Sequence, residues 1–125
     1  MTQQGGATTL QIDMMGTKAR MKNDPVLVSL VRRLREALHP ELIYLFGSRA
    51  RGEAGADSDY DFFVVVPQSD KPRHKRDEEA YLVLCGSGVA KDVVVLTRAE
   101  FEASRRTAAS LTSAVLSEGI LLHEA

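Results

Sequence analysis

The apolar positions of residues 24–38 repeat with the period of an α-helix. Leucine or valine stands at positions 27, 30, 31, 34 and 38, which places all five side chains on one helical face, with the arginines off it. Asn23 or Asp24 can cap the first turn, and Pro25 suits the first helical position because its missing N–H would have no partner there. The pattern predicts an amphipathic helix that ends before Pro40.

Two short apolar runs follow this helix, and both predict strands. Leu42–Phe46 is stopped by Gly47, and Asp59–Val66 is stopped by Pro67. The second run ends in five consecutive apolar residues, a pattern typical of a strand that is covered on both faces. Between the runs, Ser48–Ser58 is rich in glycine, alanine and charge, which indicates a turn with room for one helical turn.

Residues 67–79 are strongly polar and lead into a predicted helix that ends near Gly86. The region, including the basic stretch Lys71–Arg76, favours a solvated loop that leads into this helix. The alternative is a basic rim that meets phosphates or a partner, or that closes over a bound nucleotide. Cys85 follows an apolar run, so we expect a small buried side chain without a reactive role.

The remaining segments alternate in the same way. Asp92–Leu96 predicts a third strand, and Thr97 can cap a short helix after it. A last helix, with Ala108, Leu111 and Val115 on its apolar face, closes at Gly119 and leads into a final apolar run. This order of elements predicts an α+β fold, in which helices pack on a mixed β-sheet.

Composition fits one globular domain. The chain has 125 residues, of which 44% are hydrophobic and 26% charged. Residues 1–22 show no periodicity and predict a flexible N-terminal leader, so the folded domain is expected to span residues 23–125. The net charge of −1 lacks the basic character of a duplex-binding protein and argues against direct nucleic-acid binding. Because no apolar run approaches the ~20 residues that cross a bilayer, we expect a cytoplasmic protein without membrane association.

The candidate chemistry lies between the first two predicted strands. Asp59 and Asp61 are two residues apart in a strand, so their side chains share a face. Two neighbouring carboxylates repel each other unless a proton or a cation lies between them, and Mg²⁺ prefers such oxygen ligands. Taken alone, the pair could also be solvated charges at the entrance of a strand.

The turn before this pair favours phosphate binding. Gly47 lets the backbone leave the strand in a conformation that other residues avoid, and Ser48 can offer its hydroxyl and its N–H to a phosphate. Arg49 and Arg51 carry guanidinium forks that match phosphate oxygens. We therefore expect a phosphate cradle beside a metal-binding carboxylate pair.

The spacing is also that of a known family. Gly47-Ser48, ten further residues and then Asp59-x-Asp61 resembles the signature of the DNA polymerase β-like nucleotidyltransferase superfamily, and of its minimal nucleotidyltransferase (MNT) branch, from about Asp24 onwards. The resemblance implies the polymerase β-like fold. It also implies that Asp92, at the position of the family's third carboxylate, joins the other two acids in holding two Mg²⁺ ions, with ATP as substrate.

The resemblance extends to a biological role. Stand-alone MNT proteins resemble antitoxins whose partner is a helical HEPN ribonuclease toxin, and AMP is transferred to a tyrosine of that toxin. A chain of 125 residues leaves little room for an acceptor-binding domain, so we expect the acceptor to come from such a partner. Two alternatives stay open: a non-catalytic antitoxin that masks its partner by contact, and an oligomeric small-molecule nucleotidyltransferase.

Overall fold

The computed structural model describes residues 24–52, 59–89 and 91–125. Within these ranges, four strands form one sheet in the order β3–β2–β1–β4, with β1 antiparallel to β2 and β4, and β2 parallel to β3. Their bounds are Leu42–Phe46 for β1, Tyr60–Val66 for β2, Lys91–Thr97 for β3 and Ile120–Glu124 for β4. The predicted leader, residues 1–22, lies outside the described residues.

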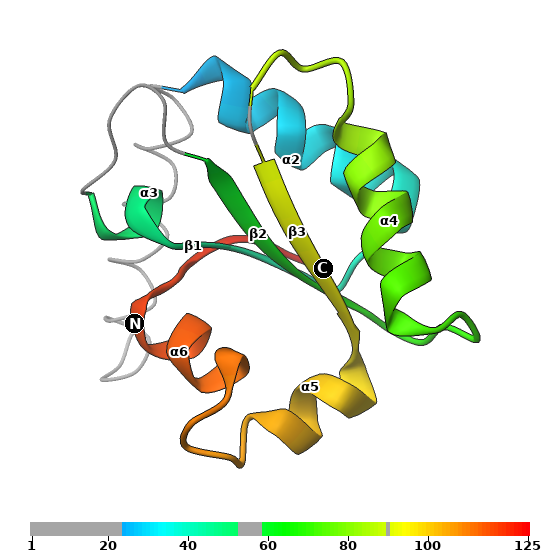
Figure 1. Cartoon of the computed structure of the whole chain (residues 1–125), viewed down its shortest axis with the longest axis vertical. Helices are drawn as coiled ribbons and strands as arrows, with labels where there is room; N and C mark the ends of the chain where they lie inside the picture. Colours follow the sequence, from blue (N-terminus) through cyan, green and yellow to red (C-terminus); the bar gives the residue numbers. More distant parts are fainter. Residues whose placement is uncertain (1–23, 53–58, 90) are drawn as a thin grey trace, which may run out of the picture.

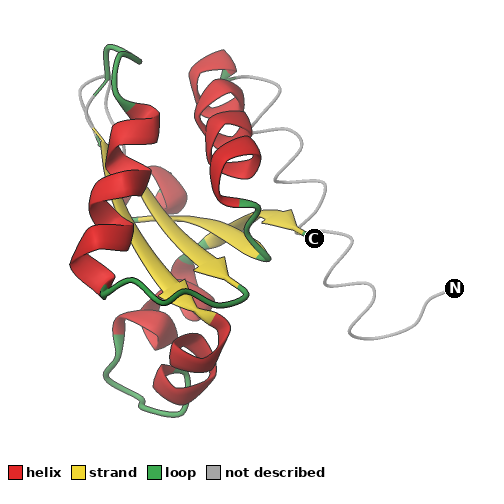
Figure 2. Ribbon diagram, turned by 90° about the vertical axis from the view of Figure 1, so that its right-hand side faces the viewer, coloured by secondary structure: helices red, strands yellow, loops and turns green. Residues whose placement is uncertain are grey.

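Helices cover both faces of this sheet. They are α2 (Pro25–Leu38), α3 (Ser48–Arg51), α4 (Arg73–Leu84), α5 (Arg98–Ser104) and α6 (Leu111–Glu118). Helices α2 and α4 lie on one face, and α5 and α6 lie on the other (Figures 1 and 2). The α+β prediction is confirmed. Among the helices of the described ranges, none has the length and apolar character that crossing a bilayer requires.

Helix α2 forms as its sequence pattern predicts. The Asp24 side chain caps it by accepting a hydrogen bond from the Leu27 N–H at 3.0 Å, and Pro25 occupies the first turn. Four of the five predicted apolar positions are fully buried, at residues 27, 30, 31 and 34. The helix ends at Leu38, and His39 adopts a left-handed conformation with φ 48°, which turns the chain toward β1.

The central strand β2 is buried on both sides, as its apolar run predicts. Tyr60, Phe62 and Val64 face the α2 and α4 side, where they join one core cluster. Phe63 and Val65 alternate with them and join a second cluster under α5 and α6. Burying each such side chain contributes about 1.5–3 kcal/mol relative to its exposed state, so β2 fixes the middle of the sheet.

Strand β3 lies at an edge, and α4 covers part of it. The Val95 N–H donates to the Asp77 carboxylate at 2.8 Å, while Arg76 Nη1 donates to the Val95 carbonyl at 3.0 Å. Arg76, only 7% exposed, also forms a two-pronged ion pair with Glu100 at 2.7 and 2.9 Å. Satisfying the backbone groups of Val95 in this way blocks the edge to other strands.

Residues 67–79 form the predicted polar loop that leads into a helix, because α4 begins at Arg73. One side chain of the basic stretch Lys71–Arg76 differs from the expectation: Arg76 is buried, whereas the other basic side chains are exposed. Arg76 contacts Val95 and Glu100, and Glu100 belongs to α5, which follows the end of β3 opposite to Asp92 (Figure 1). A basic rim in this stretch therefore does not include Arg76.

Two expectations about apolar side chains were wrong. Cys85 is exposed, because α4 ends at Leu84 and the cysteine lies at its cap. The last helix begins only at Leu111, so Ala108 lies before it and is exposed, and Leu111 is 42% exposed because it is the first residue of α6. Thr112 takes the inward position instead and shares a 2.6 Å hydrogen bond with the Ser104 hydroxyl.

Candidate active site

Three chain segments meet at one end of the strands, where β1 ends and β2 and β3 begin. Phe46, the last residue of β1, is paired with Asp61 of β2, and Asp61 is in turn the parallel partner of Asp92 in β3. The end of β1 therefore lies beside the beginnings of β2 and β3. The turn that follows Phe46 reaches the same place as the two carboxylates.

The alternation of each strand sets the direction of its carboxylate. Asp61 alternates with the Tyr60 and Phe62 side chains, so it lies on the α5 and α6 face of the sheet. Asp92 lies on this face as well, because it alternates with the buried Val93 of the α2 and α4 side. Asp59 directly precedes β2 and is exposed. The structure thus brings Asp61 and Asp92 together, with Asp59 at the entrance.

The electrostatics of Asp61 reflect this crowding of acids. Partial burial raises the pKa of its carboxyl, and the charges of Asp59 and Asp92 raise it further, while Arg51 lowers it. Both other acids therefore lie within electrostatic range of Asp61. A cation that bound among them would relieve the repulsion.

Gly47 closes the other side of this site. Its backbone has φ 78° and ψ −159°, a region that is essentially restricted to glycine. A Cβ atom at this position would collide with the Asp61 carboxylate. Its carbonyl accepts hydrogen bonds from the Ala50 and Arg51 N–H groups at 3.1 and 3.2 Å, which start α3. The backbone of the turn thus lies directly against a candidate metal ligand.

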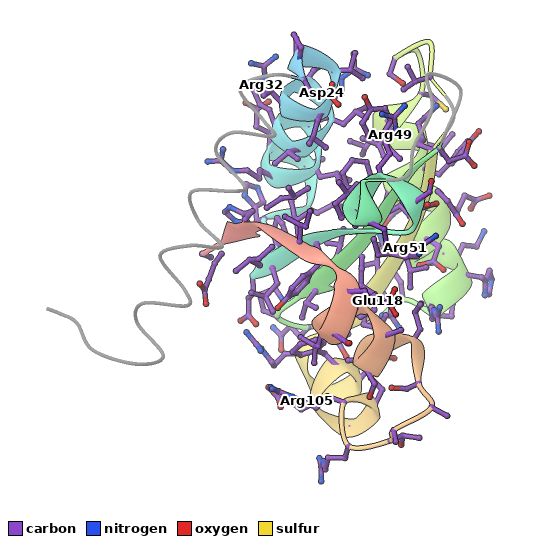
Figure 3. All side chains as sticks on the ribbon, turned by 90° about the vertical axis from the view of Figure 1, so that its left-hand side faces the viewer. Asp24, Arg32, Arg49, Arg51, Arg105 and Glu118 are labelled. Carbon is purple, nitrogen blue, oxygen red and sulfur yellow. The ribbon has the colours of Figure 1, made fainter. Side chains whose placement is uncertain are left out.

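The two arginines of α3 point to different sides. Arg51 lies on the α6 side and pairs with Glu118 at 3.8 Å, whereas the Arg49 guanidinium lies over the Tyr60 ring, 3.9 Å from its centroid (Figure 3). Residues two apart on a helix do not face each other, so this divergence follows from the helical turn. The charge of Arg51 acts on Asp61 and lowers the pKa of its carboxyl.

Sequence reasoning missed the side chains that support this turn. Tyr60 is 4% exposed and donates a 2.7 Å hydrogen bond to the Asp24 carboxylate. Glu118 pairs with Arg51 from the end of α6. These partners lie 36 and 67 positions apart in the chain, so no local pattern could have paired them.

The family follows from comparison with known proteins. A profile of the family described as "Nucleotidyltransferase domain" matches residues 27–122. The chain belongs to this family. A search of curated protein sequences gave no significant match.

One solved structure supports the nucleotidyltransferase fold, and two further structures are similar to a lesser degree. A Sulfolobus solfataricus protein assigned to the nucleotidyltransferases has 20% identity and a TM-score of 0.57, over 90% of this chain and 87% of its own. A mutant form of the toxin–antitoxin MntA–HpeT has 20% identity and a TM-score of 0.48, over 78% of this chain and 71% of its own. A toxin–antitoxin with AMP-PNP has 22% identity and a TM-score of 0.45, over 82% of this chain and 74% of its own.

The carboxylates of this nucleotidyltransferase domain suit Mg²⁺ in combination with a nucleotide. Within the described ranges, no three His, Cys, Asp or Glu side chains converge closely enough to hold a metal by themselves. Mg²⁺ does not need such a cage, because it commonly binds one or two protein carboxylates and completes its shell with phosphates and water. Asp61, crowded by two like charges and facing Gly47, which has no side chain, fits that mode.

Proposed function

We propose that this domain transfers AMP from ATP to a hydroxyl group, namely a tyrosine of a helical HEPN-type toxin, and that it acts as the antitoxin of the pair. One observation supports the proposed transfer most directly. The Gly47 backbone closely approaches the Asp61 carboxylate, and Asp92 lies next to Asp61 on the neighbouring strand. A backbone that binds phosphate and acids that bind metal are then side by side.

Each residue of the site has a proposed role. Gly47 and Ser48 present the backbone and a hydroxyl to the triphosphate, and Arg51, with Arg49 next to it in α3, supplies positive charge. Asp59, Asp61 and Asp92 hold the Mg²⁺ ions. The bound metal would neutralise the charge of the triphosphate and of the departing pyrophosphate.

The proposed reaction is a substitution at phosphorus. The tyrosine oxygen forms a bond to the α-phosphorus of ATP, and the bond from that phosphorus to the oxygen bridging to the β-phosphorus breaks. The products are a tyrosine–AMP ester and pyrophosphate. The hydroxyl proton passes to the carboxylate of Asp92 and from there to water. The other acids and the turn keep the two reactants in position, which supplies most of the rate increase.

The protein acceptor rests on the motif. The Gly-Ser-x10-Asp-x-Asp spacing resembles that of the MNT branch, in which the acceptor belongs to a separate toxin chain. The family match supports nucleotide transfer in general. The proposal therefore makes two separable statements, one on the reaction and one on the acceptor.

Intact mass spectrometry tests both statements. The protein is incubated with ATP, Mg²⁺ and the product of the adjacent gene, and the mass of that product is followed. We expect a gain of one AMP, which disappears with Asp59→Asn. Asp59 is exposed and precedes β2, so this substitution should leave the fold intact. The unfolding temperature of the variant checks this directly.

The alternatives give different results in the same assay. Inhibition of the partner without any mass change would support masking by contact and contradict the proposed transfer. Release of pyrophosphate from ATP with a small hydroxyl compound, but no change in the partner, would keep the reaction and overturn the protein acceptor.

A further inference from the structure

Tyr60 lies between the two acids of the Asp59-x-Asp61 motif, but its side chain points to the opposite face of the sheet. It is 4% exposed and joins the core cluster under α2 and α4. Its ring is stacked on that of Phe62, with centroids 6.4 Å apart and planes 9° apart. Its position and orientation are thus fixed by the core beneath the site.

Both ends of this side chain make further contacts. The hydroxyl donates a 2.7 Å hydrogen bond to Asp24 Oδ2, while Oδ1 of the same carboxylate caps α2. The ring carries the Arg49 guanidinium at 3.9 Å from its centroid. One side chain therefore connects the start of α2, the start of β2 and helix α3. Figure 3 labels the Asp24 side chain at the start of α2 and the Arg49 side chain on α3.

Helix α3 depends on this face for its position. It has only four residues, and the core contact that it makes is through Ala50, which is 7% exposed and belongs to the same cluster as Tyr60. A helix this short is not stable by itself. Contacts at Ala50 and Arg49, together with the Arg51–Glu118 ion pair and the pairing of Phe46 with Asp61, therefore hold the Gly47–Ser48 turn in place relative to Asp61.

We propose that Tyr60 is a positioning residue of the nucleotide site: it holds α3 through Arg49, and so sets the Gly47–Ser48 turn against Asp61. This inference rests on the proposed function for its effect on the nucleotide. It goes beyond that function by giving the residue between the two acids a role of its own. A merely structural Tyr60 would stabilise the fold without affecting the turn in particular.

The test compares two substitutions of Tyr60. Tyr60→Phe keeps the ring beneath Arg49 and loses only the bond to Asp24, whereas Tyr60→Leu loses both. Affinity is measured by calorimetry with Mg²⁺ and a non-hydrolysable ATP analogue. We expect the dissociation constant to rise about tenfold in Tyr60→Leu, the size of a lost cation–π contact, and by no more than about threefold in Tyr60→Phe.

Phe101→Leu is the matched control for lost stability. Phe101 is 2% exposed and lies in the core cluster of the other face, away from α3. It should lower the unfolding temperature but leave the affinity for the analogue unchanged. An unchanged affinity in folded Tyr60→Leu would overturn the proposal, and so would an equal loss of affinity in Phe101→Leu at the same stability.

Amide hydrogen exchange supplies a readout without nucleotide. The Ala50 and Arg51 N–H groups bond to the Gly47 carbonyl, so their exchange reports on the turn. We expect about tenfold faster exchange at these two amides in Tyr60→Leu, and little change in Phe101→Leu. If the wild-type protein bound no nucleotide, the proposed function would fail, yet exchange would still decide whether Tyr60 holds the turn. Unchanged exchange of the two amides in Tyr60→Leu would contradict the proposal that Tyr60 holds the turn.

Discussion

At the scale of single residues, Gly47 joins backbone conformation to the chemistry of the site. Its φ of 78° with ψ −159° suits glycine alone, and a Cβ would meet the Asp61 carboxylate. We expect Gly47→Ala to lower the free energy of unfolding by about 2–3 kcal/mol and nucleotide transfer by at least about tenfold. Urea unfolding and the initial rate of transfer measure the two effects.

Gly52→Ala is the control for this substitution. Gly52 has a similar φ of 76°, but an added Cβ would have no atom of the described ranges within 4 Å. We expect a loss of about 1–2 kcal/mol from the backbone alone, with transfer nearly unchanged. Equal losses of transfer in the two variants would show that contact with Asp61 is not what Gly47 provides.

We expect the ionised carboxylate of Asp61 to lower the free energy of unfolding at neutral pH, although the same group serves the proposed reaction. Its carboxyl pKa in the folded state lies above the ordinary value of 3.8, because of burial and of the charges of Asp59 and Asp92. The folded state then binds more protons than the unfolded chain at pH above 3.8, so stability falls as pH rises through that window. At neutral pH the ionised carboxylate of Asp61 therefore lowers the free energy of unfolding.

Asp61→Asn removes this penalty together with a proposed metal ligand. Without metal at pH 7, we expect the variant to have a higher unfolding temperature than the wild type. This difference in unfolding temperature should become smaller toward pH 4. Transfer should fall by at least about a hundredfold. Scanning calorimetry at the two pH values measures the difference in unfolding temperature, and a variant less stable than wild type at pH 7 would refute this account of Asp61.

At the scale of elements, the edge strand β3 depends on α4 and α5. Arg76 and Asp77 satisfy the backbone of Val95, and Glu100 pairs with Arg76. Hydrogen bonds from Arg76, and from the backbone N–H of Thr97, lower the pKa of Glu100 to about 2. The stabilisation is therefore complete above the ordinary value of about 4.5 and is lost as pH falls toward 2.

Glu100→Gln tests this contact. We expect the free energy of unfolding at pH 7 to fall by about 1–2 kcal/mol, since Glu100 is partly exposed, and the difference from wild type to vanish near pH 2. Glu78→Gln on the outer side of α4 is the control, because its ion pair with Lys75 is exposed. A difference for Glu100 that persisted unchanged at low pH would contradict the ion pair as its cause.

Most elements could be predicted because their signals are local. The apolar period of α2, its Asp24 cap and the short apolar runs of the strands each need only neighbouring residues, and their predicted bounds agree with the structure to within one or two positions. Burial of Arg76 could not be predicted, because its partner Glu100 is 24 positions away. The exposure of Cys85 depends on where α4 ends, which no single residue marks.

The candidate site was partly predictable for the same reason. The Gly-Ser-x10-Asp-x-Asp spacing points to Gly47, Asp59 and Asp61, and the structure brings Asp61 and Asp92 into register. The contact of Tyr60 with Asp24 needed the fold, because it joins two elements. The separation of Arg49 from Arg51 could have been foreseen from their spacing in a helical turn.

At the scale of the molecule, the order of the strands brings distant parts of the chain together at one end of β1, β2 and β3. Order β3–β2–β1 places the turn after β1 beside Asp61 and Asp92, and the end of α6 joins them through Glu118 and Arg51. Glu100, the partner of Arg76, belongs to α5, which follows the other end of β3 (Figure 1). Substitutions at Glu100 should therefore change stability and leave nucleotide transfer intact, since they lie away from the proposed site.

The central claim is that the α-phosphoryl group of ATP, with its nucleoside, is what the protein transfers. The most direct measurement uses two samples of ATP, labelled at the α- or at the γ-phosphorus, each incubated with Mg²⁺, the protein and its candidate toxin partner. We predict that label from the α-position appears on the partner and that label from the γ-position leaves as pyrophosphate. Transfer of the γ-label, or of neither label to any acceptor, would contradict the account.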